Sequence, residues 1–258
     1  MTSEVHPSWV YGDFFKAASE LKYNIDFVSS SADFSGYRLV FAPYQLMVDK
    51  ELVARFAKFV ENGGTLVLSA HSGVKDRDNA FTPETLPIFG LRDLFGMESD
   101  GFNVYQPPAR GANFLRFESG IEIPANVFAE KLHPLSGRVV ATWGKDYLKG
   151  LPAVIENRKG SGKAVYYGSF FNYESAAYLV KTLGEELGLK PILTGIPKEV
   201  EVTRRSKGEY DYYFILNHRE EPVEIKPGAG FLDLLSGRDC PPALALEGFG
   251  YRVLRKRR

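Results

Sequence analysis

The loop from His71 to Asn79 gathers the residue types that most often perform chemistry in enzymes. It carries one imidazole, one hydroxyl group and two carboxylates, at His71, Ser72, Asp76 and Asp78. Adjacent His and Ser residues do not make a catalytic triad, because a triad is assembled in space, and Ser72 lacks the first glycine of a Gly-x-Ser-x-Gly turn. Two carboxylates two residues apart in one loop rarely reach opposite sides of a glycosidic bond. We therefore predict local hydrogen bonding here, and name these four residues as the candidate ligand-binding groups.

The other reactive residue types are scattered along the chain. Glutamine amidotransferases place a nucleophilic cysteine in a sharp turn after a strand, whereas the single cysteine, Cys240, lies far from the loop, between Asp239 and two prolines. We expect an inert or structural thiol. Residues 160–163 (Gly-Ser-Gly-Lys) resemble a phosphate loop, but they precede a strand rather than a helix, which favours a hairpin turn. His133 and His218 stand alone, so we predict no metal site and no cofactor.

A strand–helix–strand unit precedes and positions the His71 loop. Two apolar runs, at 38–43 and 65–70, flank a helical segment at 49–62. Asp49 can accept the free amides of the first helical turn, and Gly63 can end the helix in a left-handed conformation. Apolar residues follow a 3.6-residue period within the helix, at Leu52, Val53, Phe56, Phe59 and Val60. Strands without polar alternation, joined by a helix, indicate parallel neighbours buried on both faces.

The remaining patterns predict an α/β part over residues 1–195 and a small all-β part over 196–258, with prolines at 191 and 197 near the boundary. The chain opens on a helix where such a domain usually opens on a central strand, so one parallel strand is expected to be missing. The segment 102–127 is irregular apart from a strand at 114–117. Further helices are predicted at 8–22, 93–96 and 174–188, and further strands at 25–28, 139–143, 153–157, 164–168, 200–203, 210–216, 222–225 and 251–254.

Composition excludes several classes of protein. Lys+Arg and Asp+Glu both total 32 in 258 residues, so no global field attracts nucleic acid or an anionic membrane. No apolar run approaches the ~20 residues of a membrane-spanning helix. No secretory signal is expected at the N-terminus, and one cysteine fits a reducing cytoplasm. Aromatic residues are abundant, which indicates either a larger core or an aromatic-rich interface. We name as interface candidates Trp9, Tyr11, Tyr44, Phe81, Phe89, Phe102 and Tyr105.

Several motifs occur in a specific order along the chain. They are 33–43 (DFSGYRLVFAP), 59–68 (FVENGGTLVL), 72–76 (SGVKD), 86–87 (LP), 91–96 (LRDLFG), 157–163 (NRKGSGK), 216–218 (LNH) and 233–237 (DLLSG). In this order and spacing they resemble the trimerisation domain and the small C-terminal β domain of glycoside hydrolase family 42 β-galactosidases. The resemblance covers the chain from about Asp26 to its end.

This resemblance implies a flavodoxin-like, class I amidotransferase-like domain with a doubly wound, mostly parallel sheet, followed by a small β-sandwich. In that family a (β/α)8 barrel supplies both catalytic glutamates, and a barrel alone takes about 250 residues. The sequence shows no barrel pattern, so no catalytic residue is assigned. The resemblance implies a non-catalytic chain that assembles, as a trimer, with copies of itself or with a barrel-bearing β-galactosidase chain.

Two other functions remain open on the residues alone. The first is a small α/β hydrolase or an amidotransferase-like or trehalose-utilisation-like enzyme with a site between His71 and Asp78, which would require these side chains to cluster in a closed pocket. The second is a sugar-binding module, which would show an open aromatic platform beside polar groups. An exposed aromatic patch would instead favour assembly.

Overall fold

The computed structural model describes residues 7–105 and 112–258, with side chains from Val10 onwards, and divides into two compact units. One unit contains Val28–Ser175 and the chain up to Val10. The other contains Tyr11–Phe27 and Ala176–Arg258. The boundary at 195/196 stays a prediction.

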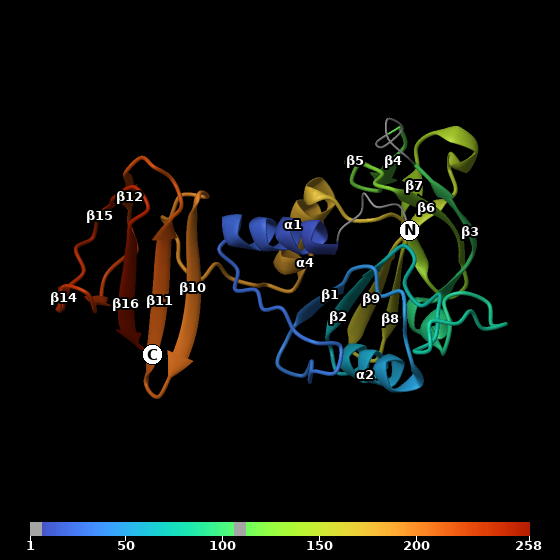
Figure 1. The fold of residues 1–258 in the computed structure, drawn as a ribbon, viewed down its shortest axis with the longest axis horizontal. Helices are drawn as coiled ribbons and strands as arrows, with labels where there is room; N and C mark the ends of the chain where they lie inside the picture. Colours follow the sequence, from blue (N-terminus) through green and yellow to red (C-terminus); the bar gives the residue numbers. More distant parts are fainter. Residues whose placement is uncertain (1–6, 106–111) are drawn as a thin grey trace. The chain divides into compact units, whose positions relative to one another are not determined.

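Helices and strands alternate in the first part of the chain, and strands dominate the second (Figure 1). The helices are α1 (Pro7–Glu20), α2 (Lys50–Glu61), α3 (Leu91–Phe95), α4 (Tyr173–Glu186) and the 3-10 turn η1 (Asp146–Leu148). Strands of the α/β unit are β1 (Leu39–Ala42), β2 (Thr65–Ser69), β3 (Met97–Val104), β4 (Phe114–Phe117), β5 (Glu122–Pro124), β6 (Phe128–Pro134), β7 (Arg138–Trp143), β8 (Pro152–Lys159) and β9 (Gly162–Tyr167).

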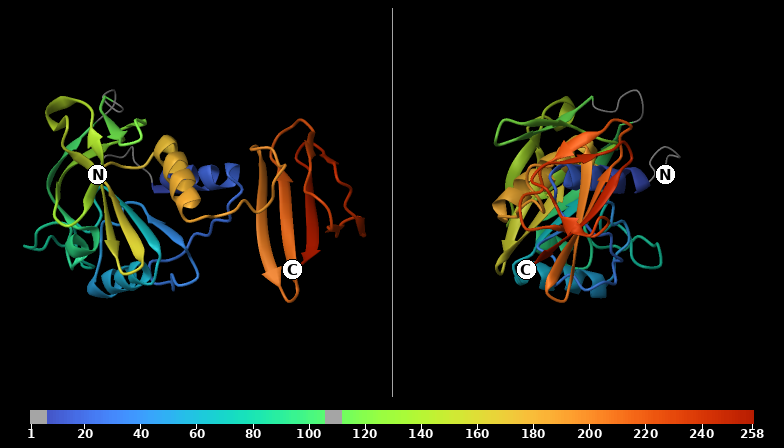
Figure 2. Two further views of the ribbon diagram at one scale, coloured as in Figure 1. Left: turned by 180° about the vertical axis from the view of Figure 1, so that it is seen from behind. Right: turned by 90° about the vertical axis from the view of Figure 1, so that its left-hand side faces the viewer.

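The unit β1–α2–β2 forms as its sequence predicts. The Asp49 side chain accepts a hydrogen bond from the Leu52 amide, and Gly63 follows the helix with a φ of 101°. All five apolar residues of the periodic stripe are buried. They pack on Leu66 and Leu68 of β2 and on Tyr166 of β9, so that α2 covers one face of the sheet. Figure 2 shows the sheet from behind, with α2 next to its strands.

The large sheet is mixed, so the prediction of a mostly parallel sheet was wrong. Its strand order is β1-β2-β9-β8-β7-β4-β5, with parallel pairs only at β1–β2 and β2–β9. The other pairs are antiparallel. A two-residue turn joins β8 to β9, and so short a connection can join only antiparallel strands. β2 is fully buried, whereas β1 forms an edge and is half-exposed, so the prediction that both strands are buried was wrong for β1.

The turn between β8 and β9 lies against the end of α2. The Ser161 amide donates to the Glu61 carbonyl at 3.1 Å, and the Lys163 amide donates to the Gly64 carbonyl at 3.0 Å. A Cβ atom at Gly162 would overlap the carbonyl oxygens of Val60 and Gly64. This close approach of two backbones explains a glycine at position 162 and confirms the hairpin over the phosphate loop.

Two segments differ from their sequence-based prediction. Residues 25–28 form no strand. Instead the Asn24 side chain exchanges hydrogen bonds with the backbone of Arg204, taking the place of a strand ladder, and the Phe27 side chain is exposed. The region 102–127, predicted to be irregular, begins within β3 and ends just before β6, and these two strands form an antiparallel pair whose register shifts between Ser99 and Phe102.

The second unit contains the all-β part. Its strands are β10 (Val200–Lys207), β11 (Tyr210–Asn217), β12 (Val223–Ile225), β13 (Leu232–Asp233), β14 (Arg238–Asp239), β15 (Leu244–Leu246) and β16 (Tyr251–Arg257). The sheet β10-β11-β16-β13-β14 and the ribbon β12–β15 share one core, in which Ile225 and Leu246 of the ribbon pack with Ile215 and Leu254 of the sheet. None of the described helices combines the length and hydropathy of a membrane-spanning segment.

A buried lysine fixes the end of α1 within this second unit. The Lys22 side chain is buried, and its Nζ donates to the carbonyls of Val200 at 2.6 Å and Lys198 at 3.1 Å. Burial lowers the pKa of Lys22 from 10.5 to about 8, and nearby Glu199, Glu20 and Glu201 oppose the shift. Loss of hydration therefore destabilises the charged ammonium more than attraction to the neighbouring carboxylates stabilises it.

Candidate functional site

The loops after β1 and β2 lie side by side at the carboxyl edge of the parallel strands, where ligand loops of open α/β sheets occur. Backbone bonds join them: the Gly73 amide donates to the Gln45 carbonyl at 2.8 Å, and the Val48 amide donates to the Lys75 carbonyl at 2.9 Å. Tyr44 and His71 both adopt positive φ angles, 53° and 65°. Because few non-glycine residues adopt this conformation, the surrounding contacts must hold each turn in place.

Ser72 is a structural residue of these loops. Its side chain is buried, and its Oγ accepts a hydrogen bond from the Gln45 amide at 3.1 Å. Ser69, the last residue of β2, plays the same part, because its Oγ accepts a hydrogen bond from the Tyr44 amide at 2.8 Å. These two hydroxyl groups bind backbone amides of the neighbouring loop, and this arrangement leaves Ser72 inside the protein.

The two aspartates of the loop do not approach His71 in any described hydrogen bond or ion pair. Asp76 Oδ1 accepts from the amides of Asp78 and Ala80, at 3.0 and 2.9 Å. The Asp78 residue is exposed. Asp76 thus closes a tight turn of its own, as the sequence predicted, and the loop brings no second carboxylate to the imidazole.

His71 instead lies beside a glutamate that the sequence did not indicate. The His71 amide donates to Glu130 Oε1 at 2.7 Å, and its Nδ1 lies 3.7 Å from the same oxygen. Glu130 is on β6 and only 3% exposed. Glu130 Oε2 and His71 Nδ1 have no hydrogen-bond partner within the described part of the chain. Burial, together with the charge of Glu130, raises the pKa of the neighbouring Tyr166.

Aromatic rings surround the imidazole of His71. The rings of Phe128 and His71 stack with centroids 4.4 Å apart, and Phe102 approaches edge-on at 4.3 Å. Phe170 packs on Phe128 at 4.6 Å and on Tyr44 at 4.8 Å. We call these five residues, Tyr44, His71, Phe102, Phe128 and Phe170, the His71 cluster. Its outermost member is Phe102, which is 50% exposed.

The other predicted interface residues differ in their exposure. Phe81 is 71% exposed beneath the Lys75 ammonium, and Tyr11 is exposed beside Phe27. Phe89 is half-buried against the core around α2 and α3. Tyr105 is buried, and its hydroxyl donates to Asp146 at 2.9 Å, so its ring is not on the surface. The side chain of Trp9 lies outside the described residues.

A separate hollow of about 310 Å³ lies at the start of α2, and three carboxylates, Asp49, Glu51 and Asp76, line it. Asp49 caps α2 and Asp76 holds two loop amides. Each therefore serves as an acceptor for fixed backbone groups. A glycosidase needs one free acid and one base or nucleophile on opposite sides of the bond, and this hollow offers only Glu51 uncommitted by a hydrogen bond or ion pair among the described residues.

No metal centre is suggested by the described residues, among which no three His, Cys, Asp or Glu side chains come close enough to hold an ion. The thiol of Cys240 is buried, and burial together with the charge of Asp233 raises its pKa. A thiol whose pKa is raised is mostly protonated at neutral pH and is a poor nucleophile.

Two family models account for most of the sequence. Residues 3–190 match the β-galactosidase trimerisation domain of glycoside hydrolase family 42, and residues 199–256 match the β-galactosidase C-terminal domain. The chain belongs to this family. It is 30% identical over 247 residues to β-galactosidase BgaA of Planococcus sp. strain SOS Orange, an alignment that covers 94% of this chain and 36% of BgaA. LacZ of Heyndrickxia coagulans is 30% identical over 243 residues, 93% of this chain and 36% of the relative.

Solved structures give the same result. The β-galactosidase from Bacillus circulans sp. alkalophilus superposes with a TM-score of 0.92 at 26% identity, covering 99% of this chain and 38% of that one. Gan42B, a family 42 β-galactosidase, superposes with a TM-score of 0.90 at 29% identity, covering 100% of this chain and 37% of that one. This family 42 chain thus spans about 36% of the length of the curated relatives it matches, and it matches their trimerisation and C-terminal segments.

Proposed function

We propose that this chain is the non-catalytic assembly part of a β-galactosidase and forms a trimer. The observation that carries the proposal is the pair of matches, to a trimerisation domain over residues 3–190 and a C-terminal domain over 199–256. Hydrolysis of terminal β-galactosides would then require a catalytic barrel, either on a partner chain or elsewhere in the same protein.

The described carboxylates support the absence of activity in this chain. Asp49 and Asp76 bind backbone amides, and Glu130 is buried beneath His71. A retaining glycosidase holds its two carboxyl groups about 5–5.5 Å apart on either side of the sugar, and an inverting one about 6.5–9.5 Å apart. Glu130, the carboxylate nearest His71, cannot reach a sugar in solvent because its side chain is only 4% exposed.

The His71 cluster provides a suitable contact for assembly. Phe102 and Val104 project from the same side of β3, and both are exposed, whereas the rings beneath Phe102 are half-buried or buried. An aromatic side chain held rigidly by its neighbours loses little entropy on binding, which is the property of interface residues that contribute most energy. We propose Phe102 as such a residue, with Val104 and Phe81 as further contacts. A stable interface would bury about 1,000 Å² or more in total.

Two finer assignments belong to the same proposal. The parallel strands β1, β2 and β9, with α2 between the first two, are the part of the sheet that we assign to a flavodoxin-like core. The antiparallel strands β8, β7, β4 and β5 extend it. A cytoplasmic location also stays a prediction, resting on the composition of the chain.

The direct test of inactivity is incubation of the purified 258-residue chain with a chromogenic β-galactoside, beside an authentic family 42 enzyme as positive control. We expect no turnover above a blank without protein. Turnover that co-purifies with the chain would overturn the proposal. The variant Glu51→Gln would then show whether the hollow at the start of α2 is responsible, because it removes the carboxylate there that no described backbone amide binds.

A further inference from the structure

The sheet of the second unit presents an ordered row of side chains on its outer face. Residues opposite each other in an antiparallel ladder place their side chains on the same face. Tyr212 of β11 pairs with Arg255 of β16, Arg255 pairs with Leu232 of β13, and Leu232 pairs with Asp239 of β14. A guanidinium, an isobutyl group and a carboxylate therefore lie next to one another across three strands, with opposite charges at the two ends.

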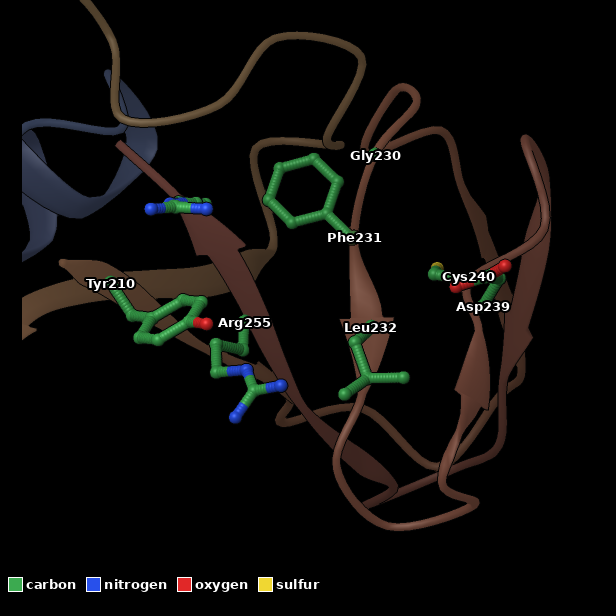
Figure 3. A pocket seen from close by; sticks show the side chains of 8 residues that line it. Tyr210, Gly230, Phe231, Leu232, Asp239, Cys240 and Arg255 are labelled. Carbon is green, nitrogen blue, oxygen red and sulfur yellow. The ribbon is translucent and has the colours of Figure 1, made fainter.

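A hollow of about 360 Å³ lies over this row (Figure 3). Arg255 and Tyr210 are on one side of Leu232, and Asp239 is on the other, as Figure 3 shows. Small-molecule sites in proteins have volumes of about 300 Å³ and more, with a few polar groups fixed on an apolar lining. The volume of this hollow is within that range, and its lining is richer in polar groups.

Two of the three charged side chains that line the hollow, Arg255 and Asp239, have no ion-pair partner among the described residues, whereas the third, Arg257, is paired. The Arg255 guanidinium lies over the Tyr210 ring, with its Cζ 4.5 Å from the ring centroid, and has no ion-pair partner in the described residues. Arg257 is paired with Glu209 at 2.9 Å. Asp239 likewise has no ion pair or side-chain hydrogen bond within the part of the chain that the structure describes. This cation–π contact holds the guanidinium over the ring, and its N–H groups can still donate two parallel hydrogen bonds to a carboxylate or a phosphate.

We propose that this hollow binds a small hydroxylated organic anion, a sugar phosphate or a sugar acid. Arg255 binds the anionic group, Leu232 contacts the carbon skeleton, and the Asp239 carboxylate accepts hydrogen bonds from hydroxyl groups at the far end. The site adds a ligand to the all-β part of the chain, and none of its lining residues belongs to the His71 cluster. Cys240, which borders the hollow, is buried with a raised pKa, so the site binds its ligand without reacting with it.

Calorimetric titration of the intact chain at low ionic strength tests this site. The probes are galactose 6-phosphate and galacturonate, with neutral galactose and inorganic phosphate for comparison. We expect saturable binding of at least one of the two anionic sugars, and binding of galactose at least about tenfold weaker, because a hydrogen bond to a charged group contributes roughly 1.5–3 kcal/mol. Inorganic phosphate should bind more weakly than galactose 6-phosphate, since it lacks the hydroxyl groups that Asp239 accepts from.

Substitutions identify the groups involved. Arg255→Gln should weaken binding of the anionic sugars at least about tenfold. Asp239→Asn should weaken binding of the same sugars and leave the affinity for inorganic phosphate unchanged. The matched control is Arg238→Gln, which removes an exposed guanidinium of the same strand pair that does not line the hollow, and it should bind as the unaltered chain does. Arg255→Lys keeps the charge but loses the planar fork, and serves if the glutamine variant does not fold. Absence of saturable binding by either anionic sugar, equal binding of galactose, or unchanged affinity in the Arg255 variants would overturn the proposal.

Discussion

Replacement of Phe102 by alanine should weaken self-association strongly. An aromatic side chain can bury about 150–250 Å², and Phe102 is 50% exposed in one chain, so about 100 Å² remains for a partner to cover. At about 25 cal/mol per Å² this corresponds to roughly 2.5 kcal/mol for each contact. Because 1.4 kcal/mol is a tenfold change, the dissociation constant should rise about 60-fold.

Sedimentation equilibrium over a series of chain concentrations measures this constant. The control is Phe249→Ala, which removes a side chain that is 67% exposed in the other unit and should change the constant less than about threefold, within the usual scatter of neutral surface substitutions. Far-ultraviolet circular dichroism must show that both variants fold. The reasoning fails if Phe102→Ala leaves the association constant unchanged, or if Phe249→Ala weakens association as much.

Two further substitutions test the fold that presents this surface. Gly162→Ala should lower the free energy of unfolding by about 2 kcal/mol or more, since its Cβ would overlap the Val60 carbonyl. The control, Gly101→Ala, has open space around the new methyl group and should lower it by less than about 1 kcal/mol. Urea denaturation measures both free energies, and equal losses would contradict this reasoning. The pKa of Lys22 is lowered from 10.5 to about 8 in the folded chain, so between those pH values the unfolded chain binds more protons and the free energy of unfolding rises with pH. Lys22→Met should flatten that rise, exposed Lys190→Met should not, and a pH profile identical in both variants would show that Lys22 is not its source.

The part of the fold that the sequence predicted is the part built from local signals. The period of Leu52 to Val60, the Asp49 cap and the Gly63 stop all act within one or two helical turns, and all three are confirmed. The hairpin turn at Gly160 was predicted for the same reason, since its conformation depends on adjacent residues. Assembly itself was inferred from the order of motifs, and the family matches confirm that resemblance.

The features that the sequence did not predict depend on contacts distant along the chain. β3 pairs with β6 across the intervening segment 105–127, which is far longer than a hairpin loop, and β3 carries a register shift that breaks its alternation. Glu130 lies between Phe128 and Leu132 on one face of β6, where a carboxylate is rarely buried, and the loop of His71, 59 residues earlier, gives it a partner. The predicted strand direction was also wrong for most of the large sheet. Parallel pairing was extended from β1 and β2 to strands that short connections join, and such strands are antiparallel.

Native mass spectrometry of the purified chain tests the central claim most directly. A trimerisation part should appear at three times the 28.8 kDa mass of one chain, and Phe102→Ala should shift that population towards single chains at the same concentration. A mass of 28.8 kDa at every accessible concentration, with no complex formed on mixing with a barrel-bearing β-galactosidase, would contradict it.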